Sequence, residues 1–302
     1  MSEDGERPPD GRLIGGRYRL VERIGSGPHG TVWRALDEQG GGYVAVKEPR
    51  FTGDPEGEER RRAAHRLPHE ARAAARVDHP AAVAIHDVLL DDELPWIVME
   101  LVEGESLDAA LAARGPLPPA EAARIGLAVL GALHAAHGVG IVHRDLKPSS
   151  VLLEAGGERV VLTDFGIGAT GQGYDREADA DFVAPECASE RGAGPASDLW
   201  SLGALLRAAV AGGEGGSLGS LLDRLLAPEP EERATAEEAA EVLADVAGTS
   251  LPEWATRSPV PTPVLPPPDA PGPSAATEPR RLTALSALSL LMQKNRNAAD
   301  RR

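Results

Sequence analysis

A pair of aspartates, each in a loop that follows an apolar stretch, constrains this 302-residue chain more than any other feature. Asp145 lies in the segment VHRDLKPSSVLL at residues 142–153, and Lys147 follows it by two positions. Asp164 comes nineteen residues after Asp145, in LTDFG at the end of a β-rich stretch. One such carboxylate can accept the proton of an attacking hydroxyl, while the other holds Mg²⁺ against nucleotide phosphates. Either aspartate alone would be an ordinary loop or capping residue, but the ordered pair favours phosphoryl-transfer chemistry.

A glycine-rich segment lies near the N-terminus. IGSGPHGTV at residues 24–32 places Gly25, Gly27 and Gly30 at G-x-G-x-x-G spacing, which alone is weak evidence. In dinucleotide-binding folds such glycines open a helix, whereas Thr31–Trp33 here favour a strand. We interpret the segment as a strand–turn–strand flap whose bare backbone can approach phosphates. An ordinary hairpin turn is the alternative.

Lys47 ends the apolar strand VAVK and is the candidate phosphate contact beneath this flap. A lysine in this position is often an edge residue that points to solvent, so the assignment needs a carboxylate to fix the ammonium. Glu70, on the following helical stretch, is the candidate partner, and its alternative is a solvated helix position. Glu58 and Glu59 are weaker competitors for the same role.

The pattern of apolar residues changes from strands to helices along the chain. β-Branched and alternating stretches predict strands at 17–24, 31–36, 43–48, 83–90 and 94–101. Helical spacing predicts helices at 56–76, 106–114, 119–138, 196–211, 217–226 and 235–246, with Pro68 allowing a break in the first. A strand-rich part followed by a helix-rich part indicates an α+β protein with two unequal lobes.

The two ends of the chain differ in composition from the centre. Residues 1–14 are polar and predict a disordered leader, and residues 249–281 form a Pro-rich linker. Residues 282–302 form a short basic amphipathic tail, for which contact with an anionic membrane is a weak hypothesis. The Pro-rich run favours a spacer, and a partner domain that binds PxxP motifs is the alternative.

Charge and cysteine content exclude several classes of protein. The formal net charge of −16 repels nucleic-acid phosphates, so we expect no nucleic-acid partner. The single cysteine, Cys187, cannot form an internal disulfide. The N-terminus has no apolar stretch of the kind a signal peptide needs, and no run is apolar and long enough to span a membrane. We therefore expect a cytoplasmic protein.

Several further motifs follow in a fixed order. After the glycine segment come VAVK at 44–47, HRDLKP at 143–148, DFG at 164–166, APE at 184–186 and SDLWSLG at 197–203. This set, from about Gly15 to Val246, resembles the eukaryotic-like Ser/Thr protein kinases of bacteria. The resemblance implies a protein kinase domain at 15–248, with a small β-rich N-lobe at 15–102 and a larger helical C-lobe at 103–248. It also implies transfer of the γ-phosphate of ATP to Ser and Thr hydroxyls of protein substrates.

The resemblance assigns roles to individual residues. Asp145 is implied as the base, Lys147 as the contact that steadies the γ-phosphate, and Asp164 as the Mg²⁺ ligand, with Mn²⁺ as a second candidate ion. Met99 resembles the gatekeeper beside the adenine. The implied ATP contacts are Ile24, Gly25, Gly27, Gly30, Val32, Ala45, Lys47, Glu70, Glu100 and Val102. Arg233 resembles the buried partner that the family provides for Glu186.

The chain departs from the family pattern at the site. Ser150 stands where the family has an asparagine that binds the second metal, and a hydroxyl is a poorer ligand than an amide carbonyl. Asp179 replaces a threonine near the base, where like charges are unfavourable. The stretch between Gly203 and Arg233 is shortened. These departures leave open a second hypothesis, a pseudokinase scaffold with weak or no nucleotide turnover.

Overall fold

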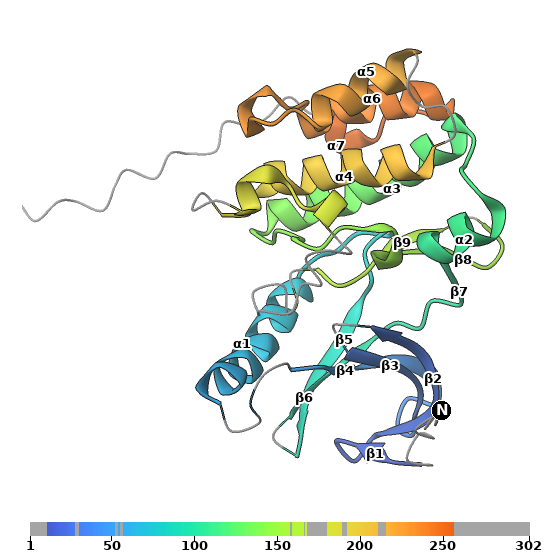
Figure 1. Cartoon of the computed structure of the whole chain (residues 1–302). Coiled ribbons are helices and arrows are strands. Elements are labelled where there is room, and N and C mark those ends of the chain that lie inside the picture. Colours follow the sequence, from blue (N-terminus) through green and yellow to red (C-terminus); the bar gives the residue numbers. More distant parts are fainter. Residues whose placement is uncertain are drawn as a thin grey trace, which may run out of the picture. The chain divides into compact units, whose positions relative to one another are not determined.

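The computed structural model (Figure 1) describes residues 11–256, apart from 28–29, 52–53, 55–56, 93, 158, 166, 168–179, 189–191 and 211–215. The strands are β1 (Leu13–Ile14), β2 (Tyr18–Gly27), β3 (Gly30–Asp37), β4 (Tyr43–Pro49), β5 (Ile85–Asp91), β6 (Leu94–Met99), β7 (Gly104–Ser106), β8 (Val151–Glu154) and β9 (Val160–Leu162). The α-helices are α1 (Glu58–Ala74), α2 (Leu107–Arg114), α3 (Pro119–Gly138), α4 (Pro195–Ala209), α5 (Gly216–Leu225), α6 (Ala236–Ala247) and α7 (Glu253–Thr256). Some predictions fall outside the described residues. They concern Asp179, the linker from residue 257 onward and the tail.

The first part of the chain forms an antiparallel six-stranded sheet with the order β1-β2-β3-β4-β6-β5. Helix α1 packs against β5 and β6 at one side of this sheet (Figure 1). After β6 the chain forms a small sheet, β7-β8-β9, and then the helices, with α3 packed against both α4 and α6. The predicted division into a β-rich N-lobe and a helical C-lobe is therefore present in the described residues.

The strand register sorts side chains onto two faces of the large sheet. Val32 lies opposite Lys47, and Ala45 lies opposite Met99, so these four residues share one face. That face carries the core that continues into the helical part, because Ala45 and Met99 belong to the same buried cluster as residues of α3 and α4. The other face has a separate small core around Trp96. The register thus points Lys47 toward the helical part of the chain.

Gly30 is the glycine of the flap that the backbone geometry requires. Its φ of +134° lies in a region that other residues rarely adopt, and a Cβ there would stand 2.0 Å from the carbonyl oxygen of Glu48. A Cβ on Gly27 would meet nothing within 4 Å. Gly30 therefore allows β3 to start close against β4, whereas Gly27 leaves open space at the end of β2.

Small residues build the helical core, which explains how a chain with 3% aromatic residues packs. A Cβ on Gly126 of α3 would stand 2.9 Å from a methyl carbon of Leu206 on α4. A Cβ on Gly203 of α4 would stand 2.8 Å from the Cβ of Leu225 on α5. The helices therefore approach closely at these glycines, and leucine side chains of the facing helix fill the contact.

Three boundaries differ from the sequence-based expectations. Helix α1 continues through Pro68, which had been expected to allow a break. The predicted leader at 1–14 extends too far, because Ile14 is completely buried in the core around Trp96 and pairs with Tyr18. The predicted linker begins too early, because residues 253–256 form α7 and the Trp254 ring stacks on His134 at 4.3 Å. An apolar segment of only two residues beside a polar or Pro-rich stretch gives too weak a pattern to predict either contact.

The Glu186–Arg233 ion pair implied by the resemblance is present and buried. The Arg233 guanidinium donates to both carboxylate oxygens of Glu186 at 2.6 and 2.7 Å, and the Ser197 hydroxyl donates to the first oxygen at 2.8 Å. Arg233 also donates to the carbonyl oxygens of Ala196, Ala227 and Pro228. The Arg233 hydrogen bonds, despite the opposing effect of burial, lower the pKa of Glu186 from 4.5 to about 2.

Glu186→Gln should lower the free energy of unfolding by about 3 kcal/mol at pH 7, because the charged partner of a buried guanidinium is lost. The pKa of Glu186 is depressed in the folded state. Its stabilisation is therefore complete above pH 4.5 and is lost as the pH falls toward about 2. Urea unfolding should show the wild-type and Glu186→Gln curves converging over this range. Asp223→Asn, in an exposed pair with Arg207, is the control and should change stability by less than about 0.5 kcal/mol. A pH-independent difference would contradict the prediction.

Gly30→Ala should lower the free energy of unfolding by about 2 kcal/mol, because the added Cβ meets the Glu48 carbonyl and the φ value is strained. Gly27→Ala is the matched variant in the same flap and should change stability by less than about 0.5 kcal/mol. Chemical denaturation of both variants measures the difference. Equal effects of the two substitutions would show that the close approach at Gly30 is not restrictive.

Candidate active site

A buried carboxylate organises the loop that carries Asp145. Asp198, near the start of α4, is 1% exposed. Its oxygens accept hydrogen bonds from the backbone N–H of His143 at 2.8 Å and of Arg144 at 2.9 Å. The ring of His137, at the end of α3, lies 2.7 Å from the same carboxylate through Nε2. Three groups from two segments thus converge on one side chain, which holds the loop in place and supports the φ of +68° at Arg144.

His143 connects this loop to the strand that leads to Asp164. Its Nδ1 accepts the backbone N–H of Asp145 at 3.3 Å, so its proton lies on Nε2, which donates to the Thr163 carbonyl at 2.7 Å. The imidazole also meets the Phe165 ring edge-on at 5.1 Å between centroids. The two nitrogens of one buried ring therefore bond the backbone N–H of Asp145 and the carbonyl of Thr163, the residue that precedes Asp164.

Asp145 and Lys147 lie side by side. The Lys147 ammonium is 3.3 Å from Oδ1 of Asp145, and both side chains are about one-tenth exposed. An ammonium this close stabilises the charged carboxylate and places a positive charge where an anionic group would approach it. The structure therefore brings together the two residues predicted to be catalytic.

Lys47 and Asp164 also meet, although the sequence paired Lys47 with Glu70. The Lys47 ammonium lies 2.6 Å from Oδ1 of Asp164, and the lysine is 5% exposed. Asp164 has a φ of +66°, in the left-handed region, which aspartate adopts more readily than most residues other than glycine. Glu70 lies on α1 and has contacts of its own. The Lys47–Glu70 pair stays a prediction, and the ion pair that the structure provides for Lys47 is with Asp164.

The Ser150 hydroxyl forms hydrogen bonds with the backbone of its own loop. Its hydroxyl donates to the Lys147 carbonyl at 2.7 Å and accepts the Lys147 N–H at 3.1 Å, and the residue is 2% exposed. Its own carbonyl accepts the N–H and the hydroxyl of Thr163. The Ser150 side chain therefore caps the short turn at Pro148–Ser150, and its role as a metal ligand stays a prediction.

The predicted nucleotide contacts come from neighbouring strands. A β-bulge between Arg23 and Gly25 leaves Ile24 47% exposed beside the flap, which is unusual for a large apolar side chain. Val32, Ala45 and Met99 share the sheet face with Lys47. The roles of these residues, and those of Gly25, Gly27, Gly30 and the backbone at Glu100–Val102, stay predictions.

The carboxylates suit a metal that is shared with a ligand. Among the described residues, no group of three or more His, Cys, Asp or Glu side chains gathers in a way that could hold a metal ion. A single carboxylate, Asp164, is enough for Mg²⁺. This ion keeps several waters and is usually held by one or two carboxylates together with substrate phosphates. The residues therefore fit a metal that arrives with a nucleotide.

A sequence model of the protein kinase domain matches residues 18–214, which is more than half of the chain. The chain belongs to the protein kinase family. Among curated relatives, this kinase chain is 38% identical over 216 residues to the serine/threonine-protein kinase PknL of Mycobacterium tuberculosis, covering 68% of this chain and 52% of PknL. It is 36% identical over 248 residues to the serine/threonine-protein kinase PkaA of Streptomyces coelicolor, covering 74% of this chain and 45% of PkaA.

The kinase domain of Mycobacterium tuberculosis PknI is a similar solved structure, with a TM-score of 0.63 and 28% identity. The match covers 80% of this kinase chain and 100% of that domain. These matches support the predicted two-lobed fold and the predicted likeness to bacterial Ser/Thr kinases. The chain spans about half the length of the curated relatives it matches. Within the described part of the kinase chain, no helix combines the length and apolarity that crossing a membrane requires.

The kinase motifs do not predict three contacts that shape the site. His137 contacts Asp198, and Ser197 contacts Glu186. In the sequence, His137 and Ser197 look like ordinary polar residues of a helix. Arg159 forms a two-pronged ion pair with Glu100, although 59 residues separate them. Only a weak signal precedes each contact, namely a polar residue within an otherwise apolar stretch.

Asp198→Asn should lower the free energy of unfolding of the kinase chain by about 3 kcal/mol, because an amide nitrogen replaces one of the two buried carboxylate oxygens that accept from three donors. Thermal and urea denaturation measure the loss. Asp245→Asn, on the exposed side of α6, is the control and should change stability by less than about 0.5 kcal/mol. A wild-type stability for Asp198→Asn would show that the loop is held without this carboxylate.

Proposed function

We propose that this chain is a protein Ser/Thr kinase that transfers the γ-phosphate of Mg-ATP to Ser or Thr hydroxyls of protein substrates. The observation that carries the proposal is the linked pair of aspartates. Asp145 lies beside Lys147 and Asp164 beside Lys47, and the His143 ring links the Asp145 N–H to the carbonyl of Thr163, which precedes Asp164. The similarity to relatives named as serine/threonine-protein kinases supports the same activity.

In this mechanism Asp145 is the base. Its carboxylate accepts the proton of the substrate hydroxyl as the hydroxyl oxygen attacks the γ-phosphorus. Lys147, 3.3 Å from that carboxylate, can hold an oxygen of the transferring group at the same time. The His143 and Asp198 contacts fix the loop backbone, so that the base needs no rearrangement before the proton moves.

Asp164 and Lys47 bind the other side of the nucleotide. Asp164 would hold the Mg²⁺, which neutralises charge on the phosphate oxygens. Once the Asp164 charge is directed at the metal, the Lys47 ammonium is available to the α- and β-phosphates and to the predicted partner Glu70. The flap glycines and the sheet face around Ala45 would cover the remainder of the nucleotide.

Ser150 bears on the choice between an active kinase and a scaffold. Because its hydroxyl caps the Lys147 backbone, we expect a weak second metal position and a higher activity in Mn²⁺ than in Mg²⁺. Lys47, Asp145 and Asp164 are all present and paired within the site, which favours turnover over the scaffold hypothesis. The substrate protein, a cytoplasmic location and a partner of the Pro-rich segment stay predictions.

Asp145→Asn should reduce phosphate transfer at least about 100-fold, because the amide cannot accept the hydroxyl proton. The measurement is incorporation of labelled γ-phosphate from ATP into the chain itself and into a basic protein substrate, in Mg²⁺ and separately in Mn²⁺. Asp108→Asn, at an exposed position of α2, is the matched control and should retain wild-type activity. Absence of transfer by the wild-type chain in both metals would contradict the proposal and favour the scaffold.

A further inference from the structure

Arg159 connects three separate segments at the back of the site. Its guanidinium donates two parallel hydrogen bonds to Glu100, from Nη1 to Oε2 and from Nη2 to Oε1, both at 2.9 Å. Its Nε donates to the Pro80 carbonyl at 2.8 Å. Glu100 in turn accepts the N–H of Ala84 through Oε1 at 2.9 Å and donates its own N–H to the Ala84 carbonyl. We call this set of contacts, formed by Arg159, Glu100, Pro80 and Ala84, the Arg159 clamp.

The electrostatics show that the Arg159 clamp is more than a chance surface pair. Both side chains are largely covered, with 32% of Arg159 and 20% of Glu100 exposed. Burial opposes the charge on Glu100, but the hydrogen bonds from Arg159 and Ala84 bring its pKa below the usual value. The hydrogen bond to Glu100 raises the pKa of Arg159. A planar guanidinium that meets a carboxylate through two bonds also fixes orientation, which a single contact does not.

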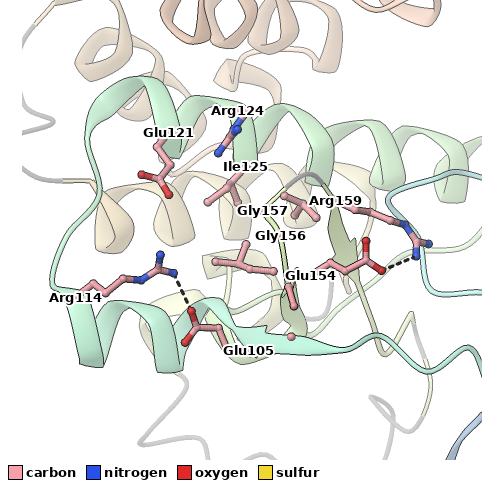
Figure 2. Close-up of a pocket in the computed structure, with 13 residues that line it drawn as sticks. Glu105, Arg114, Glu121, Arg124, Ile125, Glu154, Gly156, Gly157 and Arg159 are labelled. Carbon is pink, nitrogen blue, oxygen red and sulfur yellow. Dashed lines mark hydrogen bonds and ion pairs between the residues drawn. The ribbon is translucent and has the colours of Figure 1, made fainter.

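Arg159 turns toward the hinge, by which we mean the segment Glu100–Val102 whose backbone is a predicted nucleotide contact. A pocket of about 390 Å³ lies between α2, the start of α3 and the β8–β9 turn (Figure 2). Arg114 pairs there with Glu105 at 3.0 Å, while Arg159 reaches out on the other side past Glu154, at 3.8 Å. Arg114 and Arg159 therefore each pair with carboxylates, and Arg159 is directed to Glu100.

The two ends of the Arg159 clamp lie next to the two ends of the proposed nucleotide site. Glu100 follows Met99 directly, and because successive residues of an extended chain face opposite ways, its side chain points away from the face that Met99 and Lys47 share. Its N–H is bonded to the Ala84 carbonyl, so its backbone carbonyl is the group proposed to face the adenine. Arg159 immediately precedes β9, and Asp164 follows that strand by two residues. The clamp therefore joins the adenine end to the metal end.

Backbone bonds make this connection stiff. The Leu162 N–H donates to the Ala81 carbonyl at 2.8 Å, and the Val83 N–H donates to the Leu162 carbonyl at 2.9 Å. Residues 80–84 thus bind β9 through the backbone and bind Arg159 and Glu100 at their two ends. A shift of the hinge relative to Asp164 would have to break the side-chain fork first.

We propose that Arg159, through its paired hydrogen bonds to Glu100, is a positioning residue that sets the separation between the hinge backbone and Asp164 and so tunes the affinity for Mg-ATP. This inference rests on the proposed kinase function. According to this inference, Arg159 and Glu100 act on the binding of nucleotide and have no effect on the recognition of the protein substrate.

The test is a double-substitution cycle on the full chain, with Arg159→Met, Glu100→Gln and the double variant. Glu100→Gln is nearly isosteric and keeps an oxygen for the Ala84 N–H. Each single variant should raise the dissociation constant for Mg-ATP, measured by calorimetry, about tenfold. The double variant should show the same rise and no further one, because each change breaks the same contact. The KM for protein substrate should stay within about twofold of the wild-type value.

Two controls separate positioning from general damage. Arg159→Lys keeps the charge without the fork and should give an intermediate affinity. Arg114→Met removes a comparable arginine from the neighbouring pocket and should bind Mg-ATP as the wild type does. Wild-type affinity in Arg159→Met and Glu100→Gln, or additive effects in the double variant, would overturn the inference and leave the kinase function standing. A wild-type chain that binds no Mg-ATP would overturn both.

Discussion

The arrangement of the site depends on one buried carboxylate. Asp198 takes hydrogen bonds from the loop of Asp145 and from the end of α3, so a single side chain fixes the relation between α4 and the catalytic loop. A carboxylate that is 1% exposed is stable only when its lone pairs are satisfied, and here three donors satisfy them. His143 then passes the constraint to the Thr163 carbonyl. The positions of Asp145 and Asp164 are therefore not independent.

The helical part is held together by close contacts between helices. Helices whose contact positions are Gly126 and Gly203 pack with their backbones near one another, so the core needs few large side chains. The Glu186–Arg233 pair fixes the segment after Ala184 against the turn before α6, where a purely apolar contact would permit sliding. Close packing therefore sets the distances between the helices, and the buried Glu186–Arg233 pair fixes how the two segments it joins are aligned.

The sequence predicts the fold and the chemical identity of the site better than its connections. Motifs such as HRDLKP and DFG locate Asp145 and Asp164 because loop position and residue type are local properties of a sequence. The approach of Lys47 to Asp164, the capping role of Ser150 and the reach of Arg159 to Glu100 depend on where distant segments come to lie. The sequence around Lys47 does not indicate whether Glu70 or Asp164 is its partner, because either carboxylate could pair with a lysine on this strand. The contacts of Ile14 and Trp254 were not predicted for a related reason, because each residue lies in a short segment of mixed composition beside a polar or Pro-rich stretch.

The Lys47–Asp164 ion pair makes the site partly self-neutralised. A divalent cation that arrived alone would compete with the ammonium for the carboxylate, and a nucleotide that arrived alone would bring its phosphates toward the negative charge of Asp164. In the proposed kinase, a nucleotide already complexed with a cation would satisfy both side chains at once, with Asp164 holding the metal and Lys47 the phosphates. Under the proposed function, the Lys47–Asp164 contact would therefore couple the binding of the two ligands and disfavour each of them in isolation.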